Sequence, residues 1–350
     1  MQKIRVMIID DTLVFRSFLA TTLSRDSAIQ VVGSFGDAQS ALDRISLLKP
    51  DVMTVDMEMP NMRGDEFMKI ALPRHPDLKA VVVSSVGSAV FDAMQAGAID
   101  FVAKPGSRPG YDNQQFANDI IEKIKIAAAA RVQSSESLGS IKPAAAAAKA
   151  PALKSLLKYG TDENVVAIGA STGGTEAILE VIKHFPKAMP GTVVVQHMPP
   201  GFTGMYAQRA NTVCNMEVRE AKNGDRVGRG LVLIAPGGDS QLHVKKDGNG
   251  YYIHLAASGK VSGHCPSVDV MFNSVAQAAG KNAVGVLLTG MGSDGANGLH
   301  SMKRAGALTI GQDEKSSVIY GMPKVAFDIG AVKQQLPLHS IGEAVIRRFS

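Results

Sequence analysis

The chain has 350 residues, of which 45% are hydrophobic, and a formal net charge of +5. This composition is typical of about two globular domains and excludes a disordered or collagen-like chain. The two cysteines, Cys214 and Cys265, form no disulfide framework and no zinc-ligand spacing, so we expect a reducing, cytoplasmic environment. The first residues lack the apolar core of a secretory signal, and no segment has the roughly 18 consecutive apolar residues of a membrane span. We therefore expect no membrane insertion.

Short apolar segments alternate with helical patterns between residues 1 and 126. The predicted strands lie near 5–9, 29–33, 52–55, 80–83 and 101–102. Between the strands, apolar residues recur at helical spacing, as in Phe116, Ile120 and Ile124. This alternation predicts a doubly wound parallel sheet of five strands, in which ligands bind at the carboxyl ends of the strands.

Acidic side chains follow two of these strands. Asp10 and Asp11 come after the first strand and Asp56 ends the third, which predicts three carboxylates at one edge of the sheet. Because clustered carboxylates repel one another, the pattern favours a hard divalent cation between them, and oxygen ligands favour Mg²⁺. Ser84 and Lys104 follow later strands and could contact a phosphoryl group, with Asp56 as its acceptor. The alternative is that each acid only caps a helix or is solvated.

Four motifs carry these residues: Ile8-Ile-Asp-Asp11, Thr54-Val-Asp-Met-Glu-Met-Pro-Asn-Met-Arg-Gly64, Val81-Val-Val-Ser-Ser85 and Gly97-Ala-Ile-Asp-Phe-Val-Ala-Lys-Pro105. Together they resemble the two-component receiver family. The resemblance implies a flavodoxin-like receiver domain at 1–126, with Asp56 phosphorylated. It further implies Mg²⁺ held by Asp10, Asp11 and Asp56, and a phosphoryl switch formed by Ser84, Lys104 and Phe101. Ser85 is the second candidate for the position given to Ser84.

Residues 127–160 differ in composition from the sequence on either side. Five basic residues, one acidic residue and an alanine run at 144–148 fall there, with few large apolar side chains. Such a segment buries too little apolar surface to form a core, which predicts a flexible interdomain linker. Leu153, Leu156 and Leu157 lie at helical spacing and could dock on a neighbour. Elsewhere basic and acidic residues nearly balance, and the chain has no Trp, which argues against a nucleic-acid partner.

A second α/β pattern begins near residue 161. Apolar strands at 165–168, 192–195 and 283–288 precede Ser171, His197 and Asp294, in that order. Because the carboxyl ends of parallel strands meet at one edge, a single crevice could hold all three side chains. A turn at 247–250 lies between two further apolar segments and predicts an antiparallel hairpin added to this sheet.

Serine, histidine and aspartate are the parts of a hydrolytic triad, and Ser171 lies in a Gly-x-Ser-x-Gly pattern typical of a nucleophile elbow. Three alternatives stay open. The glycine-rich loop could cradle a nucleotide phosphate, although it lacks both Gly-x-Gly-x-x-Gly and the P-loop lysine. The second domain could be a noncatalytic binding module, with Ser171 serving only its structure. Other histidines could be the base: His254, His264, His300 and His339.

Five motifs stand out in the second half of the chain: Ile168-Gly-Ala-Ser-Thr-Gly-Gly-Thr-Glu-Ala-Ile178, Gln196-His-Met-Pro-Pro-Gly-Phe-Thr203, Pro266-Ser-Val-Asp-Val270, Leu288-Thr-Gly-Met-Gly-Ser-Asp-Gly295 and Gly321-Met-Pro323. Together they resemble the catalytic domain of the CheB chemotaxis methylesterase family. The resemblance implies a doubly wound α/β esterase domain at 161–350. It also implies a phosphorylation-activated serine esterase that demethylates glutamate methyl esters on chemoreceptors, releases methanol and deamidates receptor glutamines.

The same resemblance assigns roles to residues. It implies Ser171 as nucleophile, His197 as base and Asp294 as orienting acid, with oxyanion support from Thr172, Gly173 and Met291. The expected partners are methyl-accepting chemoreceptors as substrate and a chemotaxis histidine kinase as phosphodonor, and the esterase reaction is expected to need no cofactor. Cys265 departs from the family pattern, where a basic residue is expected before Pro-Ser-Val-Asp. This departure concerns a substrate contact and not the triad.

Overall fold

The protein is described by a computed structural model that covers residues 2–85, 87–106, 111–130 and 163–349. The chain folds into two compact units, Met1–Ser140 and Ile141–Ser350. Most of the predicted linker at 127–160 lies outside the described residues, as do Leu153, Leu156 and Leu157. Its first residues continue helix α5, in which Ala127 is fully buried. The boundaries proposed from the sequence stay predictions.

The first unit contains a five-stranded sheet in the order β2-β1-β3-β4-β5, with every neighbouring pair parallel. The strands are β1 (Ile4–Ile9), β2 (Ile29–Phe35), β3 (Val52–Asp56), β4 (Lys79–Ser84) and β5 (Asp100–Ala103). The helices are α1 (Leu13–Ser24), α2 (Ala38–Leu48), α3 (Gly64–Arg74), α4 (Gly87–Gln95) and α5 (Asn113–Ala129). The predicted five-stranded parallel sheet is confirmed.

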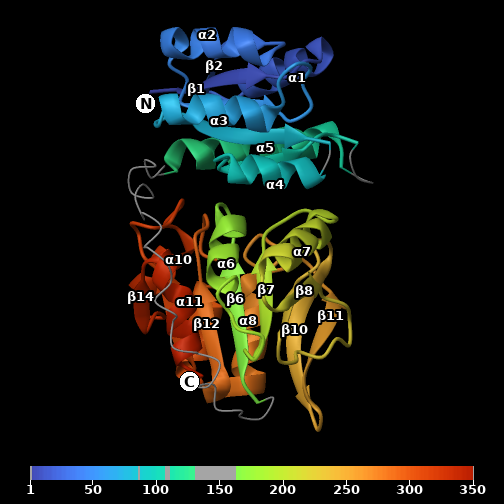
Figure 1. Cartoon of the computed structure of the whole chain (residues 1–350), viewed down its shortest axis with the longest axis vertical. Helices are drawn as coiled ribbons and strands as arrows, with labels where there is room; N and C mark the ends of the chain where they lie inside the picture. The colour runs from blue at the N-terminus through green and yellow to red at the C-terminus, as the bar shows by residue number, and fades with distance from the viewer. Residues whose placement is uncertain (1, 86, 107–110, 131–162, 350) are drawn as a thin grey trace, which may run out of the picture. The chain divides into compact units, whose positions relative to one another are not determined.

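Helices cover the sheet of the first unit (Figure 1). α1 packs beside α5, while α3 packs against both α2 and α4. The central strands are apolar because they are buried on both faces, as the full burial of Met53 and Val55 in β3 illustrates. In α5, Phe116, Ile120 and Ile124 are fully buried, so the predicted apolar face is the one that meets the core.

The second unit contains a seven-stranded parallel sheet in the order β14-β13-β12-β6-β7-β9-β8. Its strands are β6 (Val165–Ala170), β7 (Gly191–Gln196), β8 (Glu217–Glu220), β9 (Leu231–Ile234), β12 (Ala283–Leu287), β13 (Leu308–Gln312) and β14 (Gln334–Leu336). The chain starts this sheet at β6 and builds outward on both sides. β6 is therefore the switch point, where ligands bind in doubly wound sheets.

The predicted antiparallel hairpin is confirmed as β10 (Ser240–Asp247) and β11 (Gly250–Ala257). Its strands form a separate two-stranded sheet and do not extend the edge of the parallel sheet. Val244 and Ile253, which are paired in the register, are both buried, and β10 packs on α8. The hairpin therefore contributes one apolar face to the core and leaves the parallel sheet intact.

Helices lie on both faces of the seven-stranded sheet (Figure 1). They are α6 (Gly174–Ile182), α7 (Phe202–Val213), α8 (Val268–Ala279), α9 (Ala296–Arg304), α10 (Met322–Asp328) and α11 (Leu338–Arg347), with a short 3₁₀ turn at Gly280–Asn282. α6 packs with α11, and α8 packs with α9. The predicted doubly wound α/β fold is thus confirmed.

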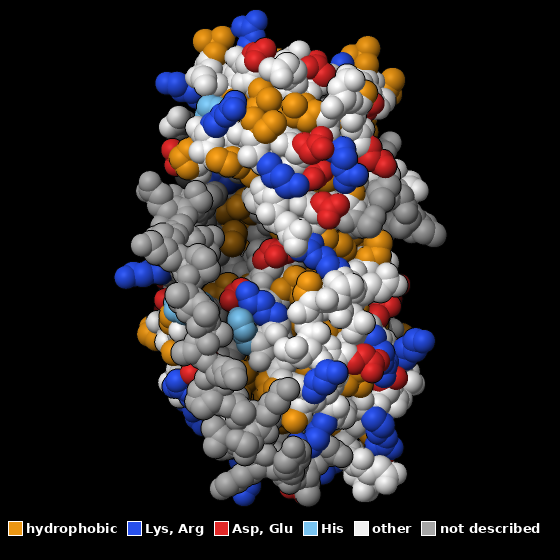
Figure 2. All heavy atoms as spheres, in the orientation of Figure 1, with side chains coloured by type: hydrophobic (Ala, Val, Ile, Leu, Met, Phe, Trp, Pro, Cys, Tyr) orange, Lys and Arg blue, Asp and Glu red, His pale blue; other side chains and the backbone are white. Residues whose placement is uncertain are grey.

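The sequence analysis expected no nucleic-acid partner and no membrane insertion, and two features of the structure concern these expectations. On the face seen in Figure 2, acidic and basic side chains are interspersed over the described residues of each unit. Among the described residues, no helix combines the length and the apolar character needed to cross a membrane.

Candidate functional sites

In the first unit, the predicted acidic residues meet at the carboxyl edge of the sheet. Asp10 directly follows β1, Asp56 ends β3, and these two strands are neighbours. One ligand oxygen from each of Asp10, Asp11 and Asp56 lies within 4.8 Å of the others. Asp10 and Asp56 are buried, while Asp11 is exposed. The cluster therefore offers a set of oxygen atoms that is open to solvent on the side of Asp11.

Lys104 joins this cluster from the end of β5. Its Nζ lies 2.8 Å from Asp10 Oδ2 and 2.6 Å from Asp56 Oδ2. Burial alone would lower the pKa of Lys104, but the two carboxylates outweigh it and raise the pKa. Burial raises the pKa of Asp56 above its ordinary value, and Lys104 only partly opposes this rise. The site therefore places a carboxylate that is costly to ionise next to a firmly charged ammonium group.

The switch candidates lie beside this cluster. Ser84 ends β4 and is fully buried, and its carbonyl oxygen accepts a hydrogen bond from the Lys104 amide at 3.0 Å. Ser85 is exposed. Phe101 lies in β5 and is buried. Among the described residues, the three carboxylates form the one group with at least three metal-ligand side chains, and oxygen donors at this spacing fit Mg²⁺.

In the second unit, Ser171 and His197 follow adjacent strands. Ala170 of β6 pairs with Gln196 of β7, and the His197 amide donates to the Ala170 carbonyl oxygen at 3.2 Å. On the other side of β6, the Ser171 amide donates to the Thr289 carbonyl oxygen at 3.0 Å, at the end of β12. The switch point therefore brings together the three loops that carry Ser171, His197 and Asp294.

Asp294 contacts His197 directly. Its Oδ2 lies 2.8 Å from His197 Nε2, and both side chains are nearly fully buried. Burial alone would raise the pKa of Asp294, but its hydrogen bond with His197 and those from Asp269 and Ser267 outweigh it and lower the pKa. The carboxylate is thus ionised at neutral pH and holds the Nε2–H tautomer of the imidazole.

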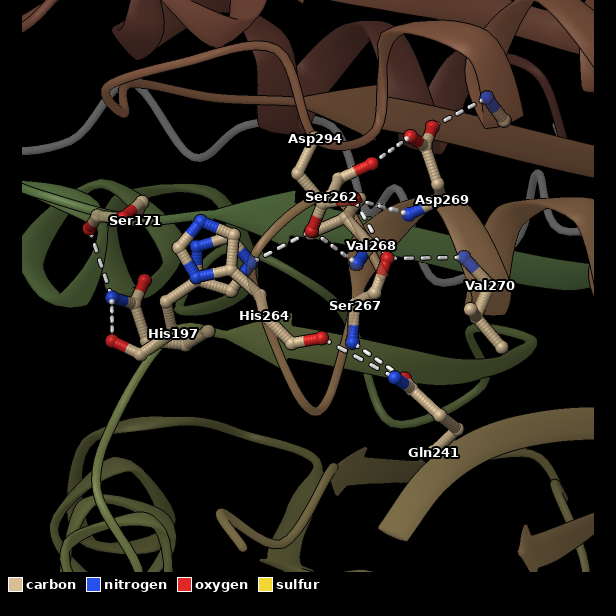
Figure 3. Close-up of polar contacts among 12 residues, drawn as sticks. Ser171, His197, Gln241, Ser262, His264, Ser267, Val268, Asp269, Val270 and Asp294 are labelled. Carbon is tan, nitrogen blue, oxygen red and sulfur yellow. Dashed lines mark hydrogen bonds and ion pairs between the residues drawn. The ribbon is translucent and has the colours of Figure 1, made fainter. Parts of the chain in front are cut away.

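The other ring nitrogen of His197 is Nδ1. His197 Nδ1 is buried and makes no hydrogen bond to any described residue. With Nε2–H committed to Asp294, Nδ1 carries a lone pair that can accept a proton. Figure 3 shows the imidazole between Ser171 on one side and Asp294 on the other. The arrangement has the order of a hydroxyl, a base and an orienting acid.

The loop that carries Ser171 is held tightly. Gln196 is buried, and its Nε2 donates to the carbonyl oxygens of Ser171 at 2.8 Å and of His197 at 3.3 Å. Gly173 caps α6 with a φ of 76°, a left-handed conformation that favours glycine. An ideal Cβ at Gly290 would lie 2.8 Å from Ser171 Cβ, so the backbone after β12 approaches Ser171 closely.

The predicted oxyanion residues are next to these two positions in the chain: Thr172 and Gly173 follow Ser171, and Met291 follows Gly290. Thr172 is buried, and its carbonyl oxygen accepts from Thr289 Oγ1 at 3.0 Å. Met291 is 48% exposed. Cys265 is half-buried, with its Sγ 3.8 Å from the Ser258 carbonyl oxygen, and burial raises its pKa.

The residues that hold Asp294 were not predicted from the sequence. Asp294 lies against the N-terminus of α8, where it accepts hydrogen bonds from Ser267 Oγ at 2.7 Å, the Val268 amide at 2.8 Å and the Asp269 amide at 3.0 Å. A signal was present, because Ser267 in Pro266-Ser-Val-Asp is a typical helix N-cap. The partner of that helix end could not be read from local sequence.

The chain resembles known proteins over its whole length. A family model described as CheB methylesterase matches residues 166–345, and one described as response regulator receiver domain matches residues 6–110. A protein-glutamate methylesterase/protein-glutamine glutaminase 2 of Syntrophomonas wolfei is 50% identical over 347 residues, covering 99% of this chain and 98% of the relative. A protein-glutamate methylesterase/protein-glutamine glutaminase of Sulfurimonas denitrificans is 48% identical, covering 97% of this chain and 96% of the relative.

A solved structure matches the second unit. The crystal structure of the Thermotoga maritima CheB methylesterase catalytic domain is 37% identical with a TM-score of 0.52, and the match covers 53% of this chain and 98% of that structure. The fold and these similarities define a response regulator whose output unit is an enzyme. Within that class, the chain belongs to the CheB methylesterase family and carries the receiver domain of response regulators. The family resemblance inferred from the sequence is confirmed, as is the expectation of a hydrolase.

Proposed function

We propose that the protein is a serine esterase that hydrolyses glutamate methyl esters on chemoreceptors and is activated by phosphorylation of its receiver. The observation that carries the proposal is the state of His197: its Nε2 lies 2.8 Å from Asp294 Oδ2, its buried Nδ1 has no hydrogen-bond partner among the described residues, and the ring lies between Asp294 and Ser171 (Figure 3). An imidazole held in this tautomer can take a proton from the serine hydroxyl. The names of the relatives supply the substrate class.

In the first step, Ser171 Oγ attacks the ester carbonyl carbon, and its proton passes to His197 Nδ1. The carbonyl oxygen becomes an oxyanion, for which the backbone N–H groups around Gly173 and Met291 are the proposed donors. Collapse of the tetrahedral intermediate breaks the bond to the methoxy group, which takes the proton from His197 and leaves as methanol. The glutamyl group stays attached to Ser171 as an ester.

In the second step, His197 takes a proton from water, and the resulting hydroxide attacks the acyl carbon. Ser171 leaves with the proton from His197, and the receptor side chain is released as glutamate. Asp294 stabilises the imidazolium in both steps without taking its proton. A receptor glutamine would follow the same route with ammonia as the first leaving group, which accounts for the second activity in the relatives' names.

The first unit is proposed to receive a phosphoryl group on Asp56 from a chemotaxis histidine kinase. Asp10, Asp11 and Asp56 would hold Mg²⁺, which supplies charge neutralisation for phosphoryl transfer when it is bound. The raised pKa of Asp56 reflects a carboxylate that is costly to keep charged in its buried position. Lys104 bridges Asp10 and Asp56, so it is placed to follow a change of charge on Asp56. The proposed cellular role is sensory adaptation in chemotaxis.

The test is release of methanol from methylated receptor membranes and of ammonia from unmodified ones. We expect the purified protein to release both products and Ser171→Ala to release neither. Ser301→Ala is a matched control, because Ser301 lies in α9 and its hydroxyl donates to the Asn297 carbonyl oxygen within the same helix. Equal methanol release by wild type and Ser171→Ala would overturn the proposal.

A further inference from the structure

A second histidine covers the imidazole of His197. The ring of His264 stacks on the ring of His197 with 3.7 Å between centroids and an angle of 11° between planes. Figure 3 shows the two rings lying one over the other, between Ser171 and Asp294. The His197 side chain is only 9% exposed, whereas His264 is intermediate in exposure. His264 therefore lies on the solvent side of the contact.

The loop that carries His264 is anchored at several points. Val261 and His264 exchange two backbone hydrogen bonds of 2.9 Å, which close a tight turn. The buried Gln241 donates from Nε2 to the carbonyl oxygens of Gly259 at 3.1 Å and of His264 at 3.3 Å. These contacts hold the loop backbone against β10.

Residues in and around this loop also contact the residues that hold Asp294. Gln241 Oε1 accepts from the Ser267 amide at 2.7 Å, and Ser262 Oγ donates to Asp269 Oδ2 at 3.1 Å. Ser267 and Asp269 belong to the helix N-terminus that holds Asp294. Hydrogen bonds therefore connect the loop of His264 to the residues that hold Asp294. His197 contacts both His264 and Asp294.

We infer that His264 is a positioning residue for His197, an inference that rests on the proposed function. The hydrogen bond to Asp294 fixes one atom of the His197 ring, but the torsion between Cβ and an sp² ring is soft. A stacked ring fixes the plane as well, so that the His197 ring stays in place between Asp294 and Ser171. The stack also covers one face of His197, whose Nδ1 is buried and has no hydrogen-bond partner among the described residues.

Three variants separate this role from others. His264→Ala removes the stack, and we expect kcat for methanol release to fall by about tenfold to 100-fold with little change in KM, because small misplacements of catalytic groups have effects of this size. His264→Phe keeps a flat ring without a titratable nitrogen, and we expect it to recover most of the lost rate. His254→Ala is the control, because His254 is also intermediate in exposure but faces His243 on the hairpin.

Each alternative role of His264 predicts a different pattern of kcat, KM and melting temperature. If His264 were itself the base, His264→Phe would be as slow as His264→Ala. If it only contacted substrate, KM would rise and kcat would stay. If it only stabilised the fold, His264→Ala would lower the melting temperature and leave the kcat of the folded protein unchanged. Any of these three results would overturn the inference.

A second readout does not depend on esterase activity. In protein labelled with ¹⁵N at histidine, the nitrogen shifts of His197 report which ring nitrogen carries the proton. We expect Nε2–H in wild type and in His264→Phe, and averaged shifts in His264→Ala. Unchanged His197 shifts in His264→Ala would contradict the inference even if the protein hydrolyses no receptor ester. Absence of methanol release by wild type would count against the proposed function alone.

Discussion

Among the single residues of the second unit, Asp294 stands out because it accepts four hydrogen bonds from separate donors. One pairs with the His197 ring, and three come from Ser267, Val268 and Asp269 at the start of α8. A helix N-terminus favours negative charge, so the site stabilises the ionised carboxylate even though it is buried. The acid of the proposed triad is therefore both charged and fixed in direction.

Asp294→Asn is expected to lower kcat for methanol release by roughly 10⁴-fold, because an amide can donate to His197 and reverse its tautomer. The measurement is the rate with methylated membranes at saturating substrate. Asp328→Asn provides the control, since Asp328 is exposed on α10 and pairs with Lys324. Near-normal turnover by a folded Asp294→Asn protein would remove the orienting role given to this acid.

Asp56 gives a prediction about stability and pH. Its pKa is raised in the folded protein, so ionising it opposes folding at every pH above that folded value. As pH falls through the folded pKa toward the unfolded value near 3.8, this cost disappears. Asp56→Asn should therefore raise the melting temperature of the first unit by a few degrees at pH 7, and the gain should shrink as pH is lowered.

The measurement for Asp56→Asn is thermal unfolding between pH 4 and 8. Asp43→Asn serves as control because Asp43 is exposed on α2. A variant that is less stable than wild type at neutral pH would show that the ion pair with Lys104 outweighs the cost of burial.

The sequence predicted the positions of the candidate residues better than their surroundings. Ser171, His197 and Asp294 each follow an apolar strand, and parallel strands end at one edge, so their proximity followed from the pattern. The stack of His264 on His197 depends on a loop at 258–264 that has no periodic pattern. Its geometry is set by long-range bonds such as those of Gln241, which local sequence does not encode.

At the scale of elements, the turn from β6 to α6 leaves no room for a side chain at Gly174. An ideal Cβ there would lie 2.1 Å from Gln196 Oε1 and 2.6 Å from Ala170 Cβ. Gln196 holds the carbonyl oxygens of both Ser171 and His197, so it cannot move away without disturbing them. The glycine therefore permits the tight entry of α6 beneath the proposed nucleophile.

Gly174→Ala is expected to destabilise the second unit by about 1–3 kcal/mol, as overpacking does, and to lower kcat as Gln196 shifts. Chemical denaturation measures the first effect and methanol release the second. Gly204→Ala in α7 is the matched control, because its Cβ would lie 3.5 Å or more from its neighbours and alanine favours a helix. Equal stability of the two variants would contradict the steric argument.

The elements themselves were predictable where strands are buried on both sides. β6, β7 and β12 are apolar because they lie at the centre of the sheet. Four strands of this sheet were not predicted: β9 and β13 lie inside it, whereas β8 and β14 each pair with a single neighbour at an edge and have few buried side chains. Edge strands of this kind carry neither the apolar pattern nor the alternation that identifies a strand.

At the scale of the whole molecule, a receiver precedes an enzyme that must admit a protein substrate. We expect the unphosphorylated receiver to inhibit the esterase, so that a fragment of residues 162–350 turns over faster than the full chain. The solved relative is a catalytic domain alone, which supports the use of such a fragment. Shifting a closed state from 99:1 to 1:99 needs about 5.5 kcal/mol, so a smaller, partial activation is expected.

Acetyl phosphate with Mg²⁺ should raise the methanol release of the full chain, and chelation of Mg²⁺ should prevent the rise. Asp56→Asn should stay slow in both conditions. The rates of the fragment, the full chain and Asp56→Asn in each condition are compared on one batch of methylated membranes. Equal rates for the fragment and the unphosphorylated chain would exclude inhibition by the receiver, and activation that persists in Asp56→Asn would place the phosphoryl switch elsewhere.

The proposed reaction passes through an acyl group on Ser171, which can be trapped. The protein is mixed with a receptor peptide that carries a glutamate methyl ester, quenched in acid within one turnover, digested and analysed by mass spectrometry. We expect a fragment containing Ser171 whose mass is increased by that of the peptide minus methanol, and no such adduct in Ser171→Ala. An acyl group on another side chain, or methanol release by Ser171→Ala at the wild-type rate, would contradict the proposed reaction.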